Sequence, residues 1–314
     1  MSRGNTNTIK GFFLLLVFLS HFKGYVKLNG SLDMHYFIVN RYMGQLIVAM
    51  FLFYSGYGVL ESLKRKKGYV DTMPKNRILK TIFNFDLAII LYVIVNHILG
   101  RVFDKKVILL SFLGWEGIGN SNWYIFAIVI LYAITWISFK AFEDKHFAGI
   151  LATTVLSVFF ILFMSRHKQA YWYDTVLCYV AGMWFSYYKK QIEEFVVSNK
   201  ASYWFLVIAV GVCYFNSYPY RTEIVGAQFW AVSFALLIVL LTMKVSFNNK
   251  MLAWVGENLF GLYILQRIPM LMLRHYGLAA YNPYVYFGVS LIVCLVIGYG
   301  FNKFCGWSYK KIAK

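Results

Sequence analysis

Residues 225–243 read VGAQFWAVSFALLIVLLTM, a stretch without a single charged side chain. About 18 or more predominantly apolar residues are enough to cross the hydrocarbon core of a bilayer as a helix. Comparable stretches recur along the chain. They lie near residues 9–27, 42–63, 80–100, 121–141, 147–165, 172–188, 202–218, 225–243, 251–273 and 283–304. The sequence therefore predicts an all-α, polytopic integral membrane protein, with about ten transmembrane helices in one bundle.

Composition supports this fold class. The chain has 314 residues, of which 60% are apolar and 14% charged, whereas a soluble domain has about 25% charged residues. An ordinary soluble globule and a disordered chain are both excluded. The predicted spans leave only short loops, so we expect a single transmembrane domain over residues 1–314, without a soluble catalytic domain. The four cysteines lie in or beside apolar stretches and are expected to act as small hydrophobic residues.

The net charge is +18, from 31 basic and 13 acidic residues. Basic residues favour cytoplasmic loops, and the densest group lies between residues 64 and 80. We therefore expect both termini to be cytoplasmic and the protein to be a multi-pass component of the cell membrane. The basic residues sit in short loops between spans, which favours membrane lipid and argues against nucleic acid as a partner.

Ten residues separate Lys10 from His21 in the first apolar stretch. On a helix, this spacing returns the side chain to within ~20° of the same face, about 16.5 Å further along the axis. An ionisable residue at that depth is costly and usually faces a polar cavity. Histidine titrates near neutral pH, as a general base must. A structural hydrogen bond to a neighbouring helix explains His21 equally well, and both interpretations stay open.

Several other segments combine polar and apolar residues. The segment Phe51–Gly58 mixes aromatic and small residues and is expected mainly to pack helices closely. Arg77 and Lys80 share a helix face, where they are expected to bind a phosphate or to anchor the chain to anionic lipid. Residues 107–120 are too short to span, and their glycines indicate irregular backbone.

Polar residues also occur within or at the edge of later spans. Trp123 and Tyr124 open one span, where they suit either a binding site or an interfacial aromatic belt. An acid beside His21 would increase its basicity. The candidates for that acid are Asp86, Glu257 and Asp174. Tyr263 and Gln266 are further polar positions in the same apolar stretch as Glu257.

In their order along the chain, these residues resemble the membrane-bound acyltransferase-3 family, which O-acetylates bacterial surface glycans. Lys10 and His21 resemble the family's basic residue and catalytic histidine, separated by ten residues. The segment Phe51–Gly56 is similar to its phenylalanine-rich stretch ending in Ser-Gly. The remaining matches are Arg77 with Lys80, Trp123 with Tyr124, and Gly256 with Tyr263. The resemblance covers nearly the whole chain.

The chain departs from the family pattern at four positions. Lysines stand at positions 10 and 80, where the family has arginine, so charge is kept but the bidentate fork is lost. Leu259 occupies the place of a serine, and Gln266 that of a terminal histidine. Gln266 therefore has no acid–base role, although its amide can form hydrogen bonds.

The resemblance implies an O-acyltransferase that moves an acyl group, with acetyl expected, from acyl-CoA to a hydroxyl of a cell-surface or lipid-linked glycan. It implies His21 as the catalytic residue, either as general base or as acyl acceptor. Asp86 is the first candidate for an acid that orients His21, and the choice between Asp86, Glu257 and Asp174 stays open. The implied donor-binding residues are Lys10, Arg77 and Lys80. The implied substrate-binding residues are Ser55, Trp123, Tyr124, Glu257, Tyr263 and Gln266. Acyl-CoA is expected as co-substrate, without a metal or a permanently bound cofactor.

Two other functions are compatible with the sequence. A transporter or flippase for a glycan-related substrate would use buried charges as a pathway, although the scarcity of proline and the lack of an internal repeat argue against it. A non-catalytic membrane scaffold would tolerate replacement of Lys10, His21 and Arg77.

Overall fold

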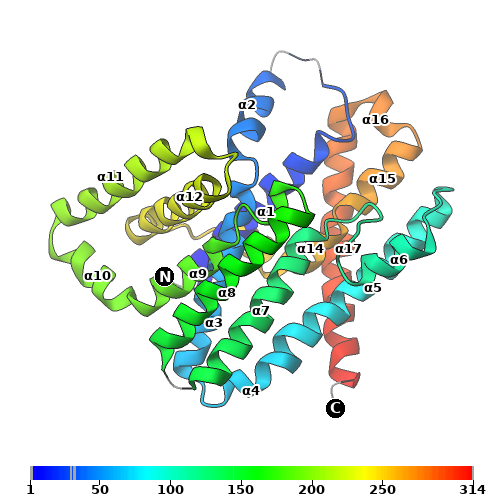
Figure 1. Cartoon of the computed structure of the whole chain (residues 1–314). Coiled ribbons are helices and arrows are strands. Elements are labelled where there is room, and N and C mark those ends of the chain that lie inside the picture. The colour runs from blue at the N-terminus through cyan, green and yellow to red at the C-terminus, as the bar shows by residue number, and fades with distance from the viewer. Residues whose placement is uncertain (1–2, 29, 31–32, 144, 313–314) are drawn as a thin grey trace. The chain divides into compact units, whose positions relative to one another are not determined.

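A computed structural model describes residues 3–28, 30, 33–143 and 145–312. All regular elements within those residues are helices (Figure 1). Seven stretches among them are long and apolar enough to cross a membrane, so the all-α polytopic fold is confirmed, although the count of ten spans is not. The seven are α3 (Leu46–Arg65), the stretch Tyr69–Ile98, α7 (Trp123–Phe142), α8 (His146–His167), the stretch Lys200–Tyr220, α12 (Ile224–Lys244) and α17 (Pro283–Ile312).

Three of the predicted spans take another form. The first apolar stretch forms α1 (Arg3–Phe22), which begins earlier than expected. The stretch near 172–188 contains only the short α9 (Leu177–Tyr187) and a preceding turn. The prediction of one continuous span over 251–273 is wrong, because the backbone there is divided into α13 (Lys250–Glu257), α14 (Leu259–Leu265) and α15 (Arg267–His275).

Polar side chains stand at both interruptions of this segment. Asn258 separates α13 from α14, and its amide donates to the carbonyl of Trp254 at 2.9 Å. Asparagine competes in this way with helical backbone bonding. Gln266 separates α14 from α15, and Pro269, which has no N–H group, lies in the first turn of α15. Hydropathy alone conceals these interruptions, because the residues on either side are apolar.

The residues between α5 (Lys80–Ile98) and α7 have the irregular backbone expected of them. After α6 (Lys105–Phe112), the chain forms no helix until Trp123. Gly114 and Gly119 have φ values of 72° and 106°, a region that side chains with a Cβ rarely adopt. The prediction that residues 107–120 do not span is confirmed.

The chain divides into two compact units. The first unit comprises residues 45–78 and 127–247, and the second comprises 2–44, 79–126 and 248–314. In the first unit, α3 packs on α9 where Gly56 and Gly182 face the opposite backbone. A Cβ on Gly56 would meet the carbonyl of Tyr179, and one on Gly182 that of Phe53. These glycines therefore allow close helix approach, as expected for the segment Phe51–Gly58.

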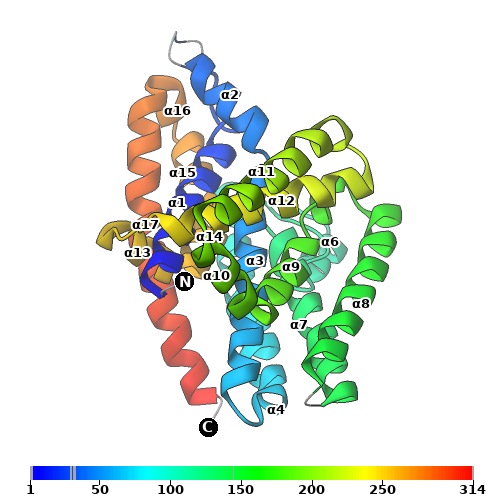
Figure 2. The same ribbon diagram turned by 90° about the vertical axis from the view of Figure 1, so that its left-hand side faces the viewer.

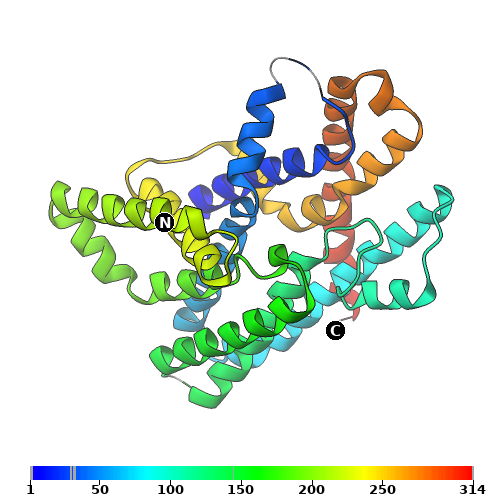
Figure 3. The same ribbon diagram turned by 45° about the horizontal axis from the view of Figure 1, so that its top comes forward.

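The second unit has two similar helix crossings. Helix α1 packs on α13 at Gly11 and Gly256, and α14 packs on α17 at Gly261 and Gly298. Figure 2 shows α1 and α13 together near the N-terminus. Figure 3 shows the long α17, in red and dark orange, beside the orange helices that precede it. The crossings hold the broken segment 250–275 between α1 and α17.

Side chains from α5 and α17 hydrogen-bond to the broken segment. Asn302 donates through Nδ2 to the Asn258 carbonyl at 2.8 Å and accepts through Oδ1 from the Gly261 N–H at 2.9 Å. The Tyr92 hydroxyl donates to the Ile264 carbonyl at 2.9 Å, and the Tyr286 hydroxyl to that of Met270 at 2.8 Å. Buried backbone groups that lose their helical hydrogen bonds need such partners inside the protein.

The α14–α17 crossing can be tested with two glycines of the same helix. A Cβ built on Gly298 would lie 2.5 Å from the Leu262 side chain and 2.9 Å from its backbone nitrogen, whereas one on Gly288 meets nothing within 4 Å. We expect Gly298→Ala to destabilise the protein by about 1–3 kcal/mol and Gly288→Ala to be neutral or slightly stabilising. Thermal unfolding in detergent measures both, and equal midpoints for the two variants would contradict the crossing.

Candidate active site

His21 lies in the last turn of α1, in the second unit. The next residue, Phe22, fixes the end of this helix by stacking on Tyr286 of α17 with ring centroids 5.4 Å apart. The His21 Nδ1 atom is buried and has no hydrogen-bond partner among the described residues. The polar and charged side chains that act on its ring are Gln266, Arg267 and Lys23. His21 thus faces the interruption between α14 and α15.

That interruption presents two polar side chains to the interior. Gln266 is 1% exposed; its Nε2 donates to the Tyr263 carbonyl at 2.8 Å, and its Oε1 is buried without a partner in the described part of the chain. Arg267 is half-buried, and its Nε atom is likewise buried and unpartnered there. Successive residues of a helix lie about 100° apart around its axis. Gln266 keeps helical backbone dihedrals, with φ −56° and ψ −27°, and both it and Arg267 act on the ring of His21.

The irregular loop before α7 supplies a third group of polar atoms. Its shape is held by Asn122, whose amide donates to the Gly114 carbonyl at 2.8 Å, and by Asn96, whose amide donates to the Ile118 carbonyl at 2.7 Å. Asn120 accepts from the Ile118 N–H, but its Nδ2 remains buried without a partner among the residues described. The same holds for the hydroxyl of Ser121, which lies beside the phenol of Tyr263.

These groups form one polar site. Folded proteins satisfy nearly all of their buried polar atoms, yet several here lack a partner within the described ranges. They are His21 Nδ1, Asn120 Nδ2, Ser121 Oγ, the Tyr263 hydroxyl, Gln266 Oε1 and Arg267 Nε. Proton acceptors and donors occur side by side, which suits acid–base chemistry on a polar substrate. No three His, Cys, Asp or Glu side chains of the described residues are grouped as metal ligands.

Lys10 and Lys80 lie in the same unit as His21 but away from it. Lys10 is three helical turns earlier on α1, about 16.5 Å along its axis, next to the crossing at Gly11. Lys80 is the first residue of α5, and its ammonium lies 5.9 Å from the ring centroid of Tyr309 near the end of α17. Tyr92, on the same helix as Lys80, contacts the broken segment twelve residues later, about 18 Å away. Both lysines thus lie at a similar distance along their helices from the His21 site.

Arg77 and Ser55 belong to the first unit. Arg77 lies in a short π-helical segment, Pro74–Leu79; its Nε donates to the Tyr69 hydroxyl at 2.8 Å, and its guanidinium lies 5.8 Å from the ring centroid of Tyr132. Ser55 precedes Gly56 at the α3–α9 crossing. Their predicted roles with the donor and the substrate stay predictions, as does that of Asp174, which is in the same unit.

Four other predicted residues lie in the second unit. Trp123 and Tyr124 are buried, and Tyr124 contacts the ring of Tyr263 at a centroid distance of 5.3 Å. Glu257 is exposed and accepts from the Asn7 amide at 3.2 Å, at the Lys10 end of α1. Asp86 lies on α5, and one of its carboxylate oxygens is buried without a partner in the described structure. The side chain that reaches His21 is Gln266, so a carboxylate partner for His21 stays a prediction.

The sequence analysis missed Tyr92 and Arg267. Arg267 had a signal, because it is a charge two positions after the apolar residues Leu259–Leu265. Tyr92 had none, since one tyrosine among many aromatic residues does not reveal that its hydroxyl reaches the Ile264 carbonyl. The sequence does not single out the polar triplet Asn120–Asn122, whose place follows from the geometry of the loop.

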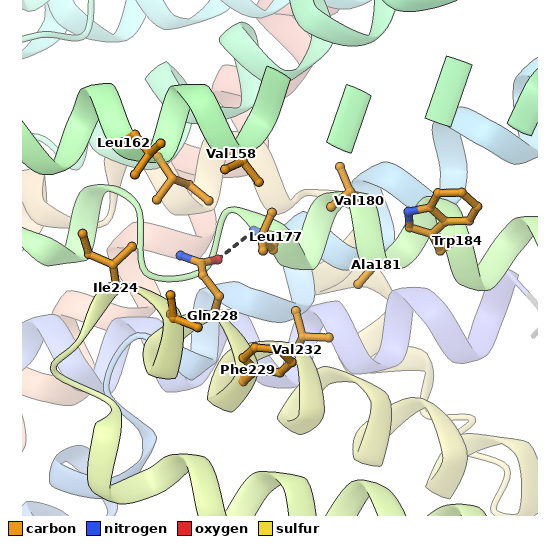
Figure 4. A pocket seen from close by; sticks show the side chains of 12 residues that line it. Val158, Leu162, Leu177, Val180, Ala181, Trp184, Ile224, Gln228, Phe229 and Val232 are labelled. Atoms are coloured by element: carbon orange, nitrogen blue, oxygen red, sulfur yellow. Dashed lines mark hydrogen bonds between the residues drawn. The ribbon is translucent and has the colours of Figure 1, made fainter. Parts of the chain in front are cut away.

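A separate hollow occurs in the first unit, between α8, α9 and α12 (Figure 4). Its volume is about 330 Å³, and its walls are aliphatic side chains with Phe229 and Trp184. Gln228 is the polar residue of its lining, and both ends of its amide are used. Oε1 accepts from the Leu177 N–H at 2.9 Å, and Nε2 donates to the Tyr173 carbonyl at 2.6 Å. This hollow therefore offers apolar surface but no reactive group.

Comparison with known proteins shows the family of the chain. A family model described as an acyltransferase domain matches residues 4–302, which include every residue of the His21 site. No curated protein and no solved structure matches the chain. An acyltransferase requires an acyl donor and an acceptor, and a histidine surrounded by unpartnered donors and acceptors suits such a reaction. The chain belongs to the acyltransferase-3 family and is an integral membrane acyltransferase.

Proposed function

We propose that the protein transfers an acyl group, most simply acetyl, from acyl-CoA to a hydroxyl of a cell-surface or lipid-linked glycan, with His21 as the general base. The observation that carries this proposal is the His21 Nδ1 atom, buried and without a partner among the described residues, facing other unpartnered polar atoms. Gln266 and Arg267 act on the same ring, so the free Nδ1 atom lies among groups that can bind a polar substrate. Family membership favours this enzyme over a transporter or a scaffold.

In this mechanism, neutral His21 takes the proton of the acceptor hydroxyl while the hydroxyl oxygen attacks the thioester carbonyl carbon. A new C–O bond forms, and the carbonyl electron pair moves to oxygen. When the carbonyl re-forms, the C–S bond breaks, and the leaving thiolate takes the proton from the imidazolium. The products are the ester and free CoA, and His21 returns to its neutral form.

The negative charge on the thioester oxygen needs hydrogen-bond donors in place before the reaction. Asn120 Nδ2, the hydroxyls of Ser121 and Tyr263, and Arg267 Nε are the unpartnered donors at the site. Preorganised donors in a water-poor site contribute more to the rate than the same groups in water, because they do not have to reorient. Arg267 and Tyr263 come from the segment 250–275, and Ser121, in the loop before α7, lies beside Tyr263.

The negative charge of its phosphates determines where acyl-CoA binds in this proposal. The phosphates of acyl-CoA are at one end of a long arm and the thioester is at the other. Lys10 and Lys80 are proposed to bind the phosphates at the cytoplasmic face, and the arm then follows α1 over the three turns to His21. A role of Arg77 with the donor stays a prediction from the sequence. The acceptor is proposed to contact Trp123, Tyr124, Tyr263 and Gln266, whereas contacts with Ser55 and Glu257 stay predictions from the sequence.

The role of His21 is tested by His21→Ala. We expect a loss of at least 10²-fold in acyl transfer, because general-base catalysis typically contributes 10²–10⁴-fold. The measurement is glycan O-acetyl content in cells, together with thioester cleavage by the purified protein. His167→Ala is the matched control, since His167 is exposed at the end of α8. Normal acetylation by well-expressed His21→Ala protein would exclude His21 as the base.

Gln266 is tested as a positioning residue for His21. We expect Gln266→Ala to lower kcat by about 10–100-fold, the size of effect seen when a residue that orients a functional histidine is lost, with little change in the KM of the donor. In the His21→Ala background the same substitution should have no further effect, because it acts through the imidazole. Additive losses in the double variant would show that Gln266 acts independently.

The two lysines are tested by comparing donors with and without phosphates. Lys10→Gln and Lys80→Gln should each raise the KM for acetyl-CoA by roughly 10-fold, the cost of losing one charge-assisted contact. The KM for acetyl-pantetheine, which lacks the nucleotide, should not change. Lys105→Gln, at an exposed lysine of α6, is the control. If both donors were affected equally, the lysines would serve folding and not phosphate binding.

A further inference from the structure

A cluster of arginines lies at the end of the second unit away from Lys10 and Lys80. Arg101 follows α5, while Arg267 and Arg274 belong to α15. All three act electrostatically on the phenol of Tyr25, which directly follows α1. Three segments thus bring three permanent positive charges to one side chain. We call Arg101, Arg267 and Arg274 the arginine cluster.

Contacts place the arginine cluster beside the His21 site. The Arg274 guanidinium lies 5.9 Å from the ring centroid of Tyr25, and its Nη1 is 3.4 Å from the Gly24 carbonyl oxygen. A Cβ built on Gly119 would lie 3.7 Å from Nη1 of Arg101. The loop that carries the unpartnered atoms of Asn120 and Ser121 therefore passes beside this guanidinium.

Ion pairs among the described residues involve Lys64, Arg65, Lys140, Lys189 and Lys190, and none of these pairs includes an arginine of the cluster. Arg267 has a buried Nε without a partner there, and adjacent Gln266 and nearby Ser121, which are 1% and 3% exposed, also carry unpartnered atoms. Buried charged donors are costly to leave unsatisfied, and an oxyanion accepts from arginine in a bidentate fork.

Membrane topology does not explain these arginines. Tyr25, just after the end of α1, interacts electrostatically with Arg101, which follows α5, and with Tyr92 of α5. The C-terminal ends of α1 and α5 therefore lie on the same side of the second unit. With the proposed cytoplasmic N-terminus, this end faces outward. Basic residues are disfavoured on that side, and anionic lipid is concentrated on the cytoplasmic side. A ligand is therefore the better reason for the cluster.

Exposure within the cluster decreases toward His21. Arg101 and Arg274 are exposed, Arg267 is half-buried, and Gln266, which contacts His21, is buried. A positive path of this kind attracts an anion from solution and guides it inward.

We propose that the acceptor carries an oxyanion, a phosphate or a carboxylate, which the arginine cluster binds so that a neighbouring hydroxyl reaches His21. Arg101 and Arg274 bind it at the entrance, and Arg267 orients it inside. The inference rests on the proposed acyl transfer at His21 and adds the chemical class of the acceptor. The group transferred and the bonds broken are those of the proposed reaction.

The test uses the full-length protein in detergent with acetyl-CoA and three model acceptors: glucose, glucose 1-phosphate and glucuronic acid. We expect kcat/KM to be at least 10-fold higher for a charged acceptor than for glucose, and the double variant Arg101→Gln, Arg274→Gln to lose that preference. A higher kcat/KM for glucose 1-phosphate alone identifies phosphate as the required group, and a higher kcat/KM for glucuronic acid alone identifies carboxylate. Arg166→Gln removes one exposed arginine at the end of α8 and should keep the preference.

Equal use of neutral and charged acceptors by the unmodified protein would overturn the inference. So would a rise in the KM for acetyl-CoA as the main effect of the double variant, because the cluster would then bind the donor. His21-dependent cleavage of acetyl-CoA by water is measured in the same samples. If that cleavage persists while the preference is absent, the inference fails alone; if cleavage does not depend on His21, the proposed function fails.

A binding measurement tests the cluster without turnover. In the presence of saturating CoA, which fills the proposed donor site, inorganic pyrophosphate should raise the unfolding midpoint of the unmodified protein and of Arg166→Gln above that in sodium chloride of the same ionic strength. The increase should be lost in the Arg101→Gln, Arg274→Gln variant. An increase of the same size in all three proteins, or none in any, would overturn the inference.

Discussion

The backbone of a helix interrupted at membrane depth has to find its hydrogen-bond partners inside the protein. The segment 250–275 is interrupted twice, and side chains of α5 and α17 provide those partners: Tyr92, Tyr286 and Asn302. Much of the second unit follows from this constraint. Gly261 and Gly298 let α17 come close enough for Asn302 to bridge the first break, and Gly11 and Gly256 let α1 lie along α13.

The site lies at the second break. Gln266 and Arg267, at the boundary between α14 and α15, both act on His21 at the end of α1. The irregular loop before α7 closes the same space with Asn120 and Ser121, held by hydrogen bonds from Asn96 and Asn122. The catalytic proposal therefore uses one histidine on a regular helix, while most of its polar surroundings come from interrupted backbone.

Charge is arranged along the second unit with one group at each end. Lys10 and Lys80 precede the site by about three turns on α1 and α5, and the arginine cluster follows those helices. A phosphorylated donor and an anionic acceptor would approach His21 from opposite ends, each toward positive charge. Transfer between two anionic substrates at a single base is consistent with a net charge of +18 on a chain of which 60% is apolar.

The sequence by itself determined the all-α membrane fold, because long apolar stretches have few stable alternatives in lipid, and the order of its motifs indicated the acyltransferase family. It also indicated His21, since an ionisable residue deep in an apolar stretch is conspicuous. Only the tertiary structure decided that 250–275 is broken, that Gln266 faces His21, and that Arg101, Arg267 and Arg274 gather at one place. Hydropathy averages over a window and cannot reveal hydrogen bonds between residues far apart in the chain, such as the 172-residue separation of Tyr92 and Ile264.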